Sequence, residues 1–178
     1  MQIKHLKLNN FCGFFGSKTF DHDFFEKTEI TGANEAGKST VKKAIFWIFN
    51  CRDENGKEIS GIRPHDENGN DINDLEVSAE LTVEVDGTVK ILKKVSRQNL
   101  NKKGEFTGNV IDYYINDIPK KASDYAEYIS SFAEEYVPYC MNAMTLFLKS
   151  SVDQRAVLAN AFGCLLYTSP SPRDYAAS

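Results

Sequence analysis

Residues 30–40, ITGANEAGKST, constrain the fold of this chain more than any other stretch of its sequence. Two glycines, a lysine and a serine within it fit the pattern G-x-x-x-x-G-K-[ST]: Gly32, Gly37, Lys38 and Ser39. In that pattern a glycine-rich turn between a strand and a helix binds phosphate through backbone N–H groups. The residues on either side therefore decide whether the motif is genuine.

Those flanking residues predict the required context. A short strand at residues 29–31 would lead into the turn, and a helix would begin at Lys38. The apolar residues at i, i+3, i+4 and i+7 of this helix are Val41, Ala44, Ile45 and Ile48. Phe46, Trp47 and Phe49 make the helix apolar on most sides, which indicates burial against a sheet.

Each residue of the motif has an expected role in binding ATP and Mg²⁺. Gly32 and Gly37 allow backbone angles and a close approach that a side chain would block. Lys38, the expected catalytic residue, neutralises the β- and γ-phosphates, while the Ser39 hydroxyl binds Mg²⁺. Thr40 extends the turn toward the α-phosphate. The expected nucleotide-binding residues are Gly32, Ala33, Asn34, Glu35, Ala36, Gly37, Lys38, Ser39 and Thr40.

The remaining pattern predicts a mixed α/β fold. Strands are expected at residues 3–8, 17–25, 77–85, 88–95 and 110–115, with tight turns at Asp86-Gly87 and Asn116-Asp117. One helix would carry Tyr125, Tyr128, Ile129 and Phe132, and a last helix would open with Ser151 and Gln154 as a capping box and end at Gly163. The expected core comprises Leu6, Leu8, Ile30, Val41, Ala44, Ile45, Ile48, Leu81, Val83, Ile91 and Tyr113.

Composition narrows the class of protein. A net charge of −4 argues against general nucleic-acid affinity. No apolar run approaches the roughly 20 residues of a membrane span, and the N-terminus lacks a signal-peptide core, so a cytoplasmic protein without a membrane partner is expected. The four cysteines and three histidines are scattered, which favours reduced thiols and no metal site built on these residues.

The opening IKHLKLNNFCGF together with GANEAGKST, in which Asn34 is third in the loop, resembles the N-terminal head segment of SMC-like ATPases. That group contains SbcC, RecF and RecN and is related to ABC ATPases. The later stretches IRPHDENGN, EFTGNVIDYYINDIP and SSVDQRAVLANAFG are similar to a phage and bacterial branch described as AAA-family and SbcC-like. The resemblance spans nearly all of residues 1–163.

The resemblance implies a P-loop ATPase head built from two lobes, one at each end of a long chain with a coiled coil between them. Residues 1–163 would be the N-terminal lobe, with an antiparallel β-hairpin insert. ATP would lie between two heads, so binding closes a homodimer and hydrolysis releases it. The implied partners are a second head, the chain's own C-terminal lobe, DNA and a nuclease, in DNA repair or recombination.

The catalytic half of such an ATPase is not apparent. A Walker B strand requires four apolar residues before Asp-Glu. Asp53 and Glu54 instead follow the helix in a turn, away from Ser39, and only two apolar residues precede Asp112. No LSGG-like sequence occurs. The intact protein is therefore expected to be an ATPase, whereas this chain alone would bind ATP without turnover.

Two departures from the family affect details of the site. Cys12 occupies a position where many relatives carry a basic residue that approaches the nucleotide, and Arg63 is a candidate substitute. The family also places a glutamine that senses Mg²⁺ and the γ-phosphate after its middle helices. Asn142 is a weak candidate for that metal contact.

The last fifteen residues, 164–178, differ from the rest in being Ser/Pro-rich. CLLYTSPSPRD resembles one reading frame of a sequencing-library adapter, which predicts a non-native tail on a chain truncated near residue 163. The alternative is a flexible C-terminal tail.

Two alternative functions remain open. A P-loop phosphotransferase such as a nucleotide kinase is one, although such a fold continues with helical lid segments and arginines. A clamp or scaffold that binds ATP without hydrolysing it is another. The basic stretch from Lys90 to Lys103 would contact DNA phosphates or, as favoured here, form a solvated hairpin face.

Overall fold

The structure is a computed structural model, which describes residues 1–53, 55–133, 146–147 and 149–161. It divides into two units, residues 1–133 and 134–178, each of which is described by itself. Several residues singled out in the sequence lie outside the described part of the chain: Glu54, Cys140, Asn142, Gly163, Cys164 and the rest of the tail 164–178.

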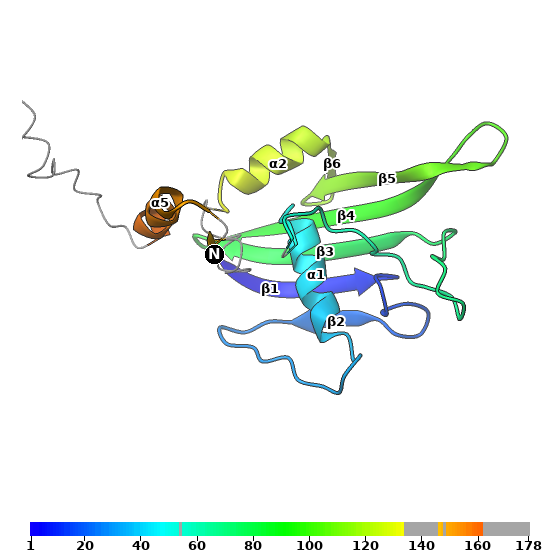
Figure 1. Cartoon of the computed structure of the whole chain (residues 1–178), viewed down its shortest axis with the longest axis horizontal. Coiled ribbons are helices and arrows are strands. Elements are labelled where there is room, and N and C mark those ends of the chain that lie inside the picture. Colours follow the sequence, from blue (N-terminus) through cyan, green and yellow to red (C-terminus); the bar gives the residue numbers. More distant parts are fainter. Residues whose placement is uncertain (54, 134–145, 148, 162–178) are drawn as a thin grey trace, which may run out of the picture. The chain divides into compact units, whose positions relative to one another are not determined.

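One six-stranded antiparallel sheet dominates the first unit, with strand order β2-β1-β3-β4-β5-β6 (Figure 1). The strands are β1 (Gln2–Asn9), β2 (Phe20–Asp23), β3 (Val77–Val85), β4 (Thr88–Leu100), β5 (Phe106–Ile115) and β6 (Ile118–Lys120). The expected hairpins are therefore present. They continue the sheet that β1 and β2 begin, because β1 pairs with both β2 and β3.

Two tight turns set the register of β3 through β6. Asp86 and Gly87 have φ values of 50° and 76°, and Asn116 and Asp117 have φ values of 50° and 63°. Positive φ at both central residues is the requirement of a type I′ turn, which matches the twist of the strands that it joins. Both predicted turns are confirmed.

Helix α1 (Lys38–Ile48) packs on one face of this sheet, across β3 and β4 (Figure 1). Along β3 buried and half-buried residues alternate, so that one face of the strand packs in the core while the other stays partly open. Seven predicted core residues are buried: Leu6, Leu8, Val41, Ala44, Ile48, Leu81 and Val83. Phe11, Trp47, Val77 and Leu92 complete this core.

Four residues that were predicted to lie in the core are not fully buried. Ile45, Ile91 and Tyr113 are half-buried, and Ile30 is 39% exposed. Residues 29–31 do not form the predicted strand, because no strand of the described part pairs with them. An extended segment without a hydrogen-bonded neighbour does not bury its side chains, which explains the exposure of Ile30.

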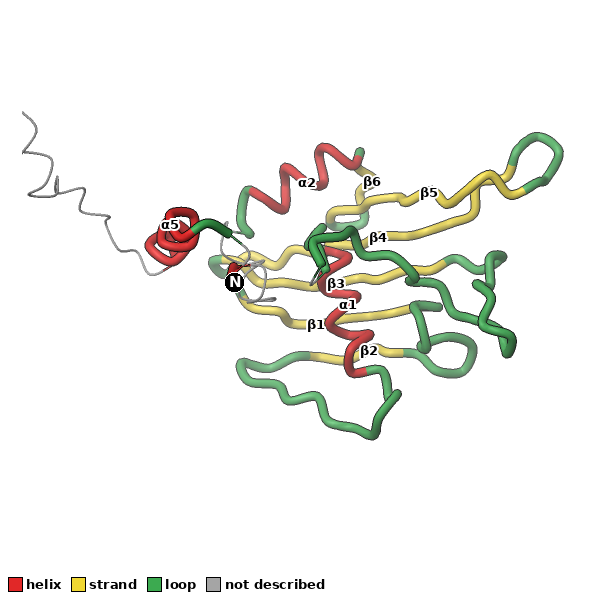
Figure 2. Tube along the Cα trace, viewed as in Figure 1, coloured by secondary structure: helices red, strands yellow, loops and turns green. Residues whose placement is uncertain are grey.

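Helix α2 (Ala122–Ser130) covers β5 and contributes the fully buried Tyr125. The Tyr125 hydroxyl donates to the carbonyl of Ile48 at 3.1 Å, and its ring lies 5.1 Å from that of Tyr113. Tyr125 therefore packs in the core, where its ring is not available for stacking on a ligand. Long loops follow β2 and α1 (Figure 2).

Helix α5 (Ser151–Ala161) belongs to the second unit. Its cap is Ser150 rather than the predicted Ser151, because Ser150 Oγ accepts from the Asp153 N–H at 3.2 Å. Gln154 donates instead to the carbonyl of Lys149 at 2.8 Å. The capping pattern therefore begins one residue earlier than the sequence indicated. None of the described helices is long and apolar enough to cross a membrane.

Candidate nucleotide-binding site

Residues 32–37 form a turn that leads directly into α1, and Lys38, Ser39 and Thr40 are the first residues of the helix. Gly37 precedes the helix with a φ of 93°, in the left-handed region that favours glycine. Its carbonyl accepts from the N–H groups of Thr40 at 3.0 Å and Val41 at 3.2 Å. Within the described residues no acceptor is paired with the N–H groups of Lys38 and Ser39, and the first helical turn has no acidic residue. The positive end of the helix therefore presents free donors to an anion.

The Lys38 side chain folds back over this turn. Its Nζ donates to the carbonyls of Gly32 and Ala33, both at 2.6 Å. Lys38 itself is exposed, as are residues 31–36. The ammonium therefore sits at the mouth of the turn, where it neutralises the dipoles of two carbonyls and remains accessible to solvent.

Two surface pockets flank the turn. The first, of about 360 Å³, is lined by Lys38, Ala36 and Gly37 together with the aromatic rings of Phe14, Phe20 and Phe24. The second, of about 370 Å³, lies along the other flank and is lined by Ser39, Lys42, Lys43 and Phe46 of α1 and by residues of the loop that follows the helix. Lys38 and Ser39 thus face different pockets. The sequence did not identify Phe14 as a residue of this site. Phe14 lies far from Gly37 in the chain, and a contact between residues so far apart leaves no periodic pattern in the sequence.

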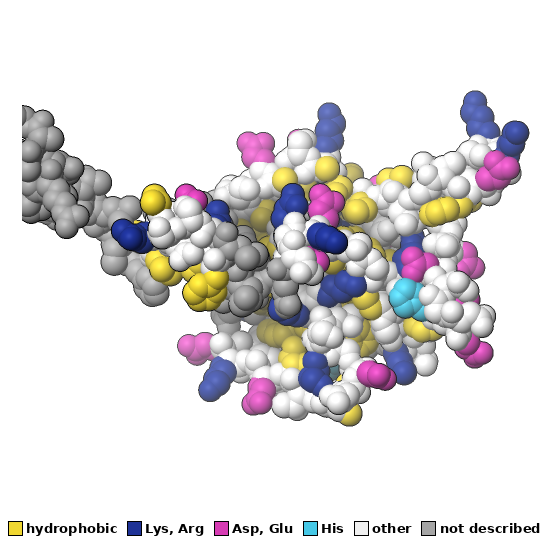
Figure 3. All heavy atoms as spheres, in the orientation of Figure 1, with side chains coloured by type: hydrophobic (Ala, Val, Ile, Leu, Met, Phe, Trp, Pro, Cys, Tyr) yellow, Lys and Arg dark blue, Asp and Glu magenta, His cyan; other side chains and the backbone are white. Residues whose placement is uncertain are grey.

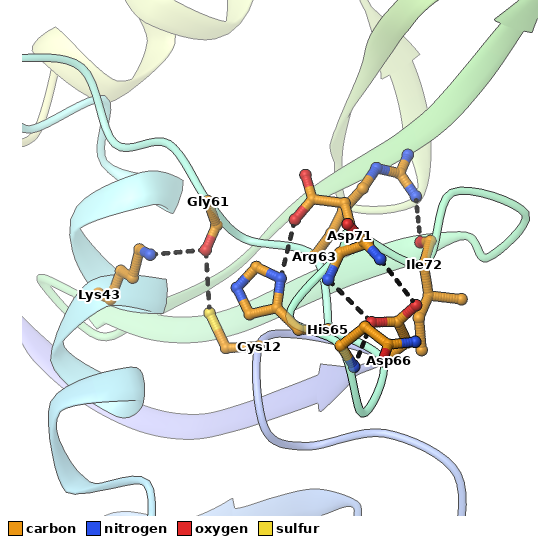
Figure 4. A network of polar contacts seen from close by, with 10 residues as sticks. Cys12, Lys43, Gly61, Arg63, His65, Asp66, Asp71 and Ile72 are labelled. Atoms are coloured by element: carbon orange, nitrogen blue, oxygen red, sulfur yellow. Dashed lines mark hydrogen bonds and ion pairs between the residues drawn. The ribbon is translucent and has the colours of Figure 1, made fainter.

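A polar network fixes the loop after α1 against the helix and the end of β1 (Figure 4). Cys12 Sγ and Lys43 Nζ both donate to the Gly61 carbonyl, at 3.5 and 2.7 Å. The Cys12 N–H donates to the Ile62 carbonyl at 2.8 Å. Burial raises the pKa of the Cys12 thiol, which therefore acts as a neutral hydrogen-bond donor. Cys12 thus holds the loop after α1 in place through Gly61 and Ile62.

Arg63 does not take over that contact. Its side chain is 2% exposed, and Nη1 donates to the carbonyls of Leu75 at 2.7 Å and Asn73 at 3.3 Å. Nη2 donates to Asn109 Oδ1 at 2.8 Å. These bonds tie the loop to β5, so the prediction that Arg63 reaches a nucleotide is wrong. Nearby, Nδ1 of His65 lies 3.0 Å from Oδ1 of Asp71 at the surface (Figure 4).

Asp53 is closer to the site than the sequence argument allowed, because it lines the same pocket as Ser39. Its carboxylate is nevertheless engaged by its own turn. Oδ1 accepts from the N–H groups of Asn55 and Lys57, both at 2.8 Å. These bonds lower the pKa of Asp53 and identify it as a turn-forming residue.

The basic residues of β4 have partners within the lobe. Lys90 Nζ donates to the Tyr128 hydroxyl at 3.2 Å. Lys93 forms an ion pair with Glu80 at 3.4 Å, and Arg97 Nε donates to Asp112 at 2.7 Å. Lys94 is 3% exposed. On the face seen in Figure 3, basic and acidic side chains are interspersed. This geometry favours the hairpin-face interpretation over a DNA-binding patch, although Lys94 is buried rather than solvated.

Comparisons with known proteins bear on the family and the fold. A family model described as AAA domain matches residues 5–151. A solved structure from work on ATP-driven dimerization and DNA-stimulated activation of SMC ATPases aligns with a TM-score of 0.54 and 15% identity, covering 90% of this chain and 99% of that one. The SMC head domain from Thermotoga maritima aligns with a TM-score of 0.47 and 26% identity, covering 72% and 42%. No curated protein matches. The mixed α/β fold with its antiparallel sheet is thus similar to the fold of the solved structure from the work on SMC ATPases.

Proposed function

Because the chain belongs to the AAA domain family, we propose that it is the N-terminal lobe of an SMC-like ATPase head and that residues 32–40 bind the phosphates of MgATP. Residues 1–163 would form this lobe, and residues 164–178 would not belong to it. The setting that we propose for the intact protein is DNA repair or recombination, with DNA and a nuclease as further partners, in the cytoplasm.

One observation carries the proposal: among the described residues, the N–H groups of Lys38 and Ser39 at the start of α1 have no acceptor, and the residue before them, Gly37, has no side chain that could cap them. Anions bind such helix starts because the unpaired N–H groups and the helix dipole act together. Lys38 adds a full positive charge at the same place. A triphosphate, with several charged oxygens in a row, matches this arrangement of donors better than a monoanion does.

Binding would require Lys38 to exchange partners. Its Nζ would leave the carbonyls of Gly32 and Ala33 and donate to the β- and γ-phosphate oxygens. Ser39 is exposed at the next helical position, so that its hydroxyl fits as a metal ligand. Bound Mg²⁺ supplies charge neutralisation between the β- and γ-phosphates. Thr40 would extend the donor set toward the α-phosphate.

Hydrolysis would need groups from outside this lobe. Ile30 lines the first pocket and is 39% exposed, and Phe25, which follows the pocket residue Phe24 in the chain, is 75% exposed. Apolar side chains exposed beside a binding site favour a covering surface. We propose that the chain's own C-terminal lobe covers this region and that a second head closes over the phosphates. The catalytic carboxylate would come from those parts.

MgATP titration of this chain tests the proposal, with Lys38→Ala as the disabling variant. Lys103→Ala, which removes the same charge from the exposed hairpin turn between β4 and β5, is the matched control. We expect a loss of at least about tenfold in affinity for Lys38→Ala, equal to about 1.4 kcal/mol, and none for Lys103→Ala. Equal binding by all three proteins would refute the site.

Turnover separates the remaining alternatives. The proposal expects no measurable phosphate release by this chain and Lys38-dependent release by the intact protein. Phosphate transfer to a nucleoside monophosphate would instead identify a kinase. An intact protein that binds MgATP and dimerises without hydrolysing it would be an ATP-gated clamp.

A further inference from the structure

Away from the phosphate site, the side chain of Lys94 lies in the core between β4 and the end of α1. It is 3% exposed, and its Nζ donates to the carbonyl of Trp47 at 2.5 Å and to Asn50 Oδ1. Both acceptors are neutral, and in the described part of the chain no carboxylate lies within ion-pair distance of this ammonium. The Glu58 carboxylate and the Cys51 thiol act on this charge from beyond ion-pair distance. A buried charge without a close counter-ion is costly, so the site favours an anion.

Aromatic rings surround the same ammonium. The Nζ of Lys94 lies 5.4 Å from the ring centroid of Trp47, 5.3 Å from that of Tyr113 and 5.5 Å from that of Tyr125. Ring faces stabilise a cation in part, through their negative quadrupole. They do not use hydrogen-bond donors, and an ammonium has three. Two of the three donors of Lys94 have acceptors, which leaves one for a ligand.

A separate pocket of about 220 Å³ lies beside Lys94. Lys94, Trp47 and Tyr113 line it, together with the apolar side chains of Ile59 and Ile111. Trp47 and Tyr113 supply aromatic surface, while the two isoleucines exclude water from the walls. Asn50, Cys51 and Glu58 supply the polar part of the lining. The pocket thus combines one buried cation with an aromatic and aliphatic wall on one part and polar groups on the rest, a lining that admits a small ligand with one charged end and an apolar body.

Two further features narrow the ligand. Glu58 is exposed and also lines the pocket, so that its carboxylate disfavours a ligand with several negative charges. Nucleotides are excluded on that ground and by the small volume. Because burial lowers the pKa of Lys94 only to about 8, the ammonium form predominates at neutral pH. A cation is therefore available to a ligand that carries a single negative charge.

We propose that this pocket binds a small monocarboxylate with a flat apolar body, whose carboxylate accepts from Lys94 and whose ring lies among Trp47, Tyr113, Ile59 and Ile111. The site is distinct from residues 32–40 and does not depend on nucleotide binding. It places a ligand at the C-terminal end of α1, the helix whose other end follows the glycine-rich turn.

Titration with benzoate, with neutral benzamide of the same shape as its partner probe, tests the proposal on the full chain. We expect benzoate to bind at least about tenfold more tightly, since only the carboxylate pairs with the ammonium. The affinity for benzoate should fall about tenfold per pH unit above about pH 8, as Lys94 loses its proton. Equal affinity for the two probes, or binding of neither at millimolar concentration, would overturn the proposal.

Variants locate the binding. Lys94→Met should abolish the preference for benzoate, whereas Lys93→Met, which alters the neighbouring β4 lysine paired with Glu80, should retain it. If Lys94→Met does not fold, Ile59→Trp provides the second test, because it fills the pocket and leaves the ammonium in place. Lys38→Ala should bind benzoate as the unaltered chain does. Unchanged benzoate binding by Ile59→Trp would place the ligand elsewhere and overturn the assignment.

Discussion

The ring of Phe14 lies against the backbone of Gly37, so closely that a Cβ added to Gly37 would stand 2.6 Å from Phe14 Cζ. Gly37 also has a φ of 93°. Two independent constraints thus require glycine at the residue that precedes α1: the absence of room for a side chain and a backbone angle that other residues rarely adopt. The segment between β1 and β2 therefore shapes the candidate phosphate site.

Gly37→Ala should impair both stability and nucleotide binding. The strained φ alone costs about 1–3 kcal/mol, and displacement of Phe14 adds to this. Because the turn must shift to accommodate the methyl group, we expect affinity for MgATP to fall by at least about tenfold. Urea unfolding and MgATP titration measure the two effects.

Gly104→Ala is the matched control for this substitution. Gly104 has a φ of 79° in the turn between β4 and β5, with no atom within 4 Å of an added Cβ. It should lose stability through φ alone and bind MgATP normally. The double variant Gly37→Ala with Phe14→Ala should recover part of the lost affinity. No recovery would show that the contact with Phe14 is not a constraint on the site.

The glycine-rich turn, α1 and the hairpin turns were predictable because their signals are local. A type I′ turn is specified by two adjacent residues such as Asp86 and Gly87, and α1 by apolar spacing over eleven residues. The contact of Phe14 with Gly37 was not predictable, since residues between them form a strand and a long loop. The prediction of a strand at residues 29–31 was wrong for a related reason, because a local pattern of residues does not specify which strand they would pair with.

Charged residues were the least predictable part of the site. Arg63 stands in a polar stretch of sequence and Lys94 in a basic one, and both were assigned to surfaces or ligands. The fold places them at 2% and 3% exposure. Their burial depends on acceptors from other elements, the carbonyl of Leu75 for Arg63 and that of Trp47 for Lys94. No periodicity in the sequence reports such acceptors.

Tyr125→Phe should destabilise the lobe by about 1 kcal/mol, the usual contribution of one buried hydrogen bond. The substitution removes the hydroxyl that donates to the Ile48 carbonyl and keeps the ring in place. Urea unfolding followed by circular dichroism measures the change. Tyr114→Phe is the control, since the Tyr114 hydroxyl makes no hydrogen bond with the described residues and Tyr114 is half-buried. Equal stability of the two variants would contradict the role of Tyr125.

Arg63→Met should destabilise the lobe without a specific effect on nucleotide binding. Loss of the guanidinium leaves the carbonyls of Asn73 and Leu75 and the amide of Asn109 without their donor, which costs about 2–4 kcal/mol in total. At a temperature where the variant remains folded, its affinity for MgATP should equal that of the unaltered chain. A folded Arg63→Met protein with weakened MgATP binding would restore Arg63 as a nucleotide contact.

The stability of the lobe should depend on pH through Lys94. Burial lowers the pKa of Lys94 from 10.5 to about 8 in the folded state, so the unfolded chain binds more protons between these values. The contribution of Lys94 to the free energy of unfolding therefore rises with pH between about pH 8 and pH 10.5, by on the order of 2–3 kcal/mol. Below about pH 8 the destabilisation that the buried charge causes is fully present. Other lysines and tyrosines also titrate there, so the readout is the difference between the unaltered chain and Lys94→Met in urea unfolding from about pH 7 to about pH 10.5. This difference should change steadily in favour of the unaltered chain as the pH rises. A difference that stays constant over the whole range would show that Lys94 does not titrate with a lowered pKa.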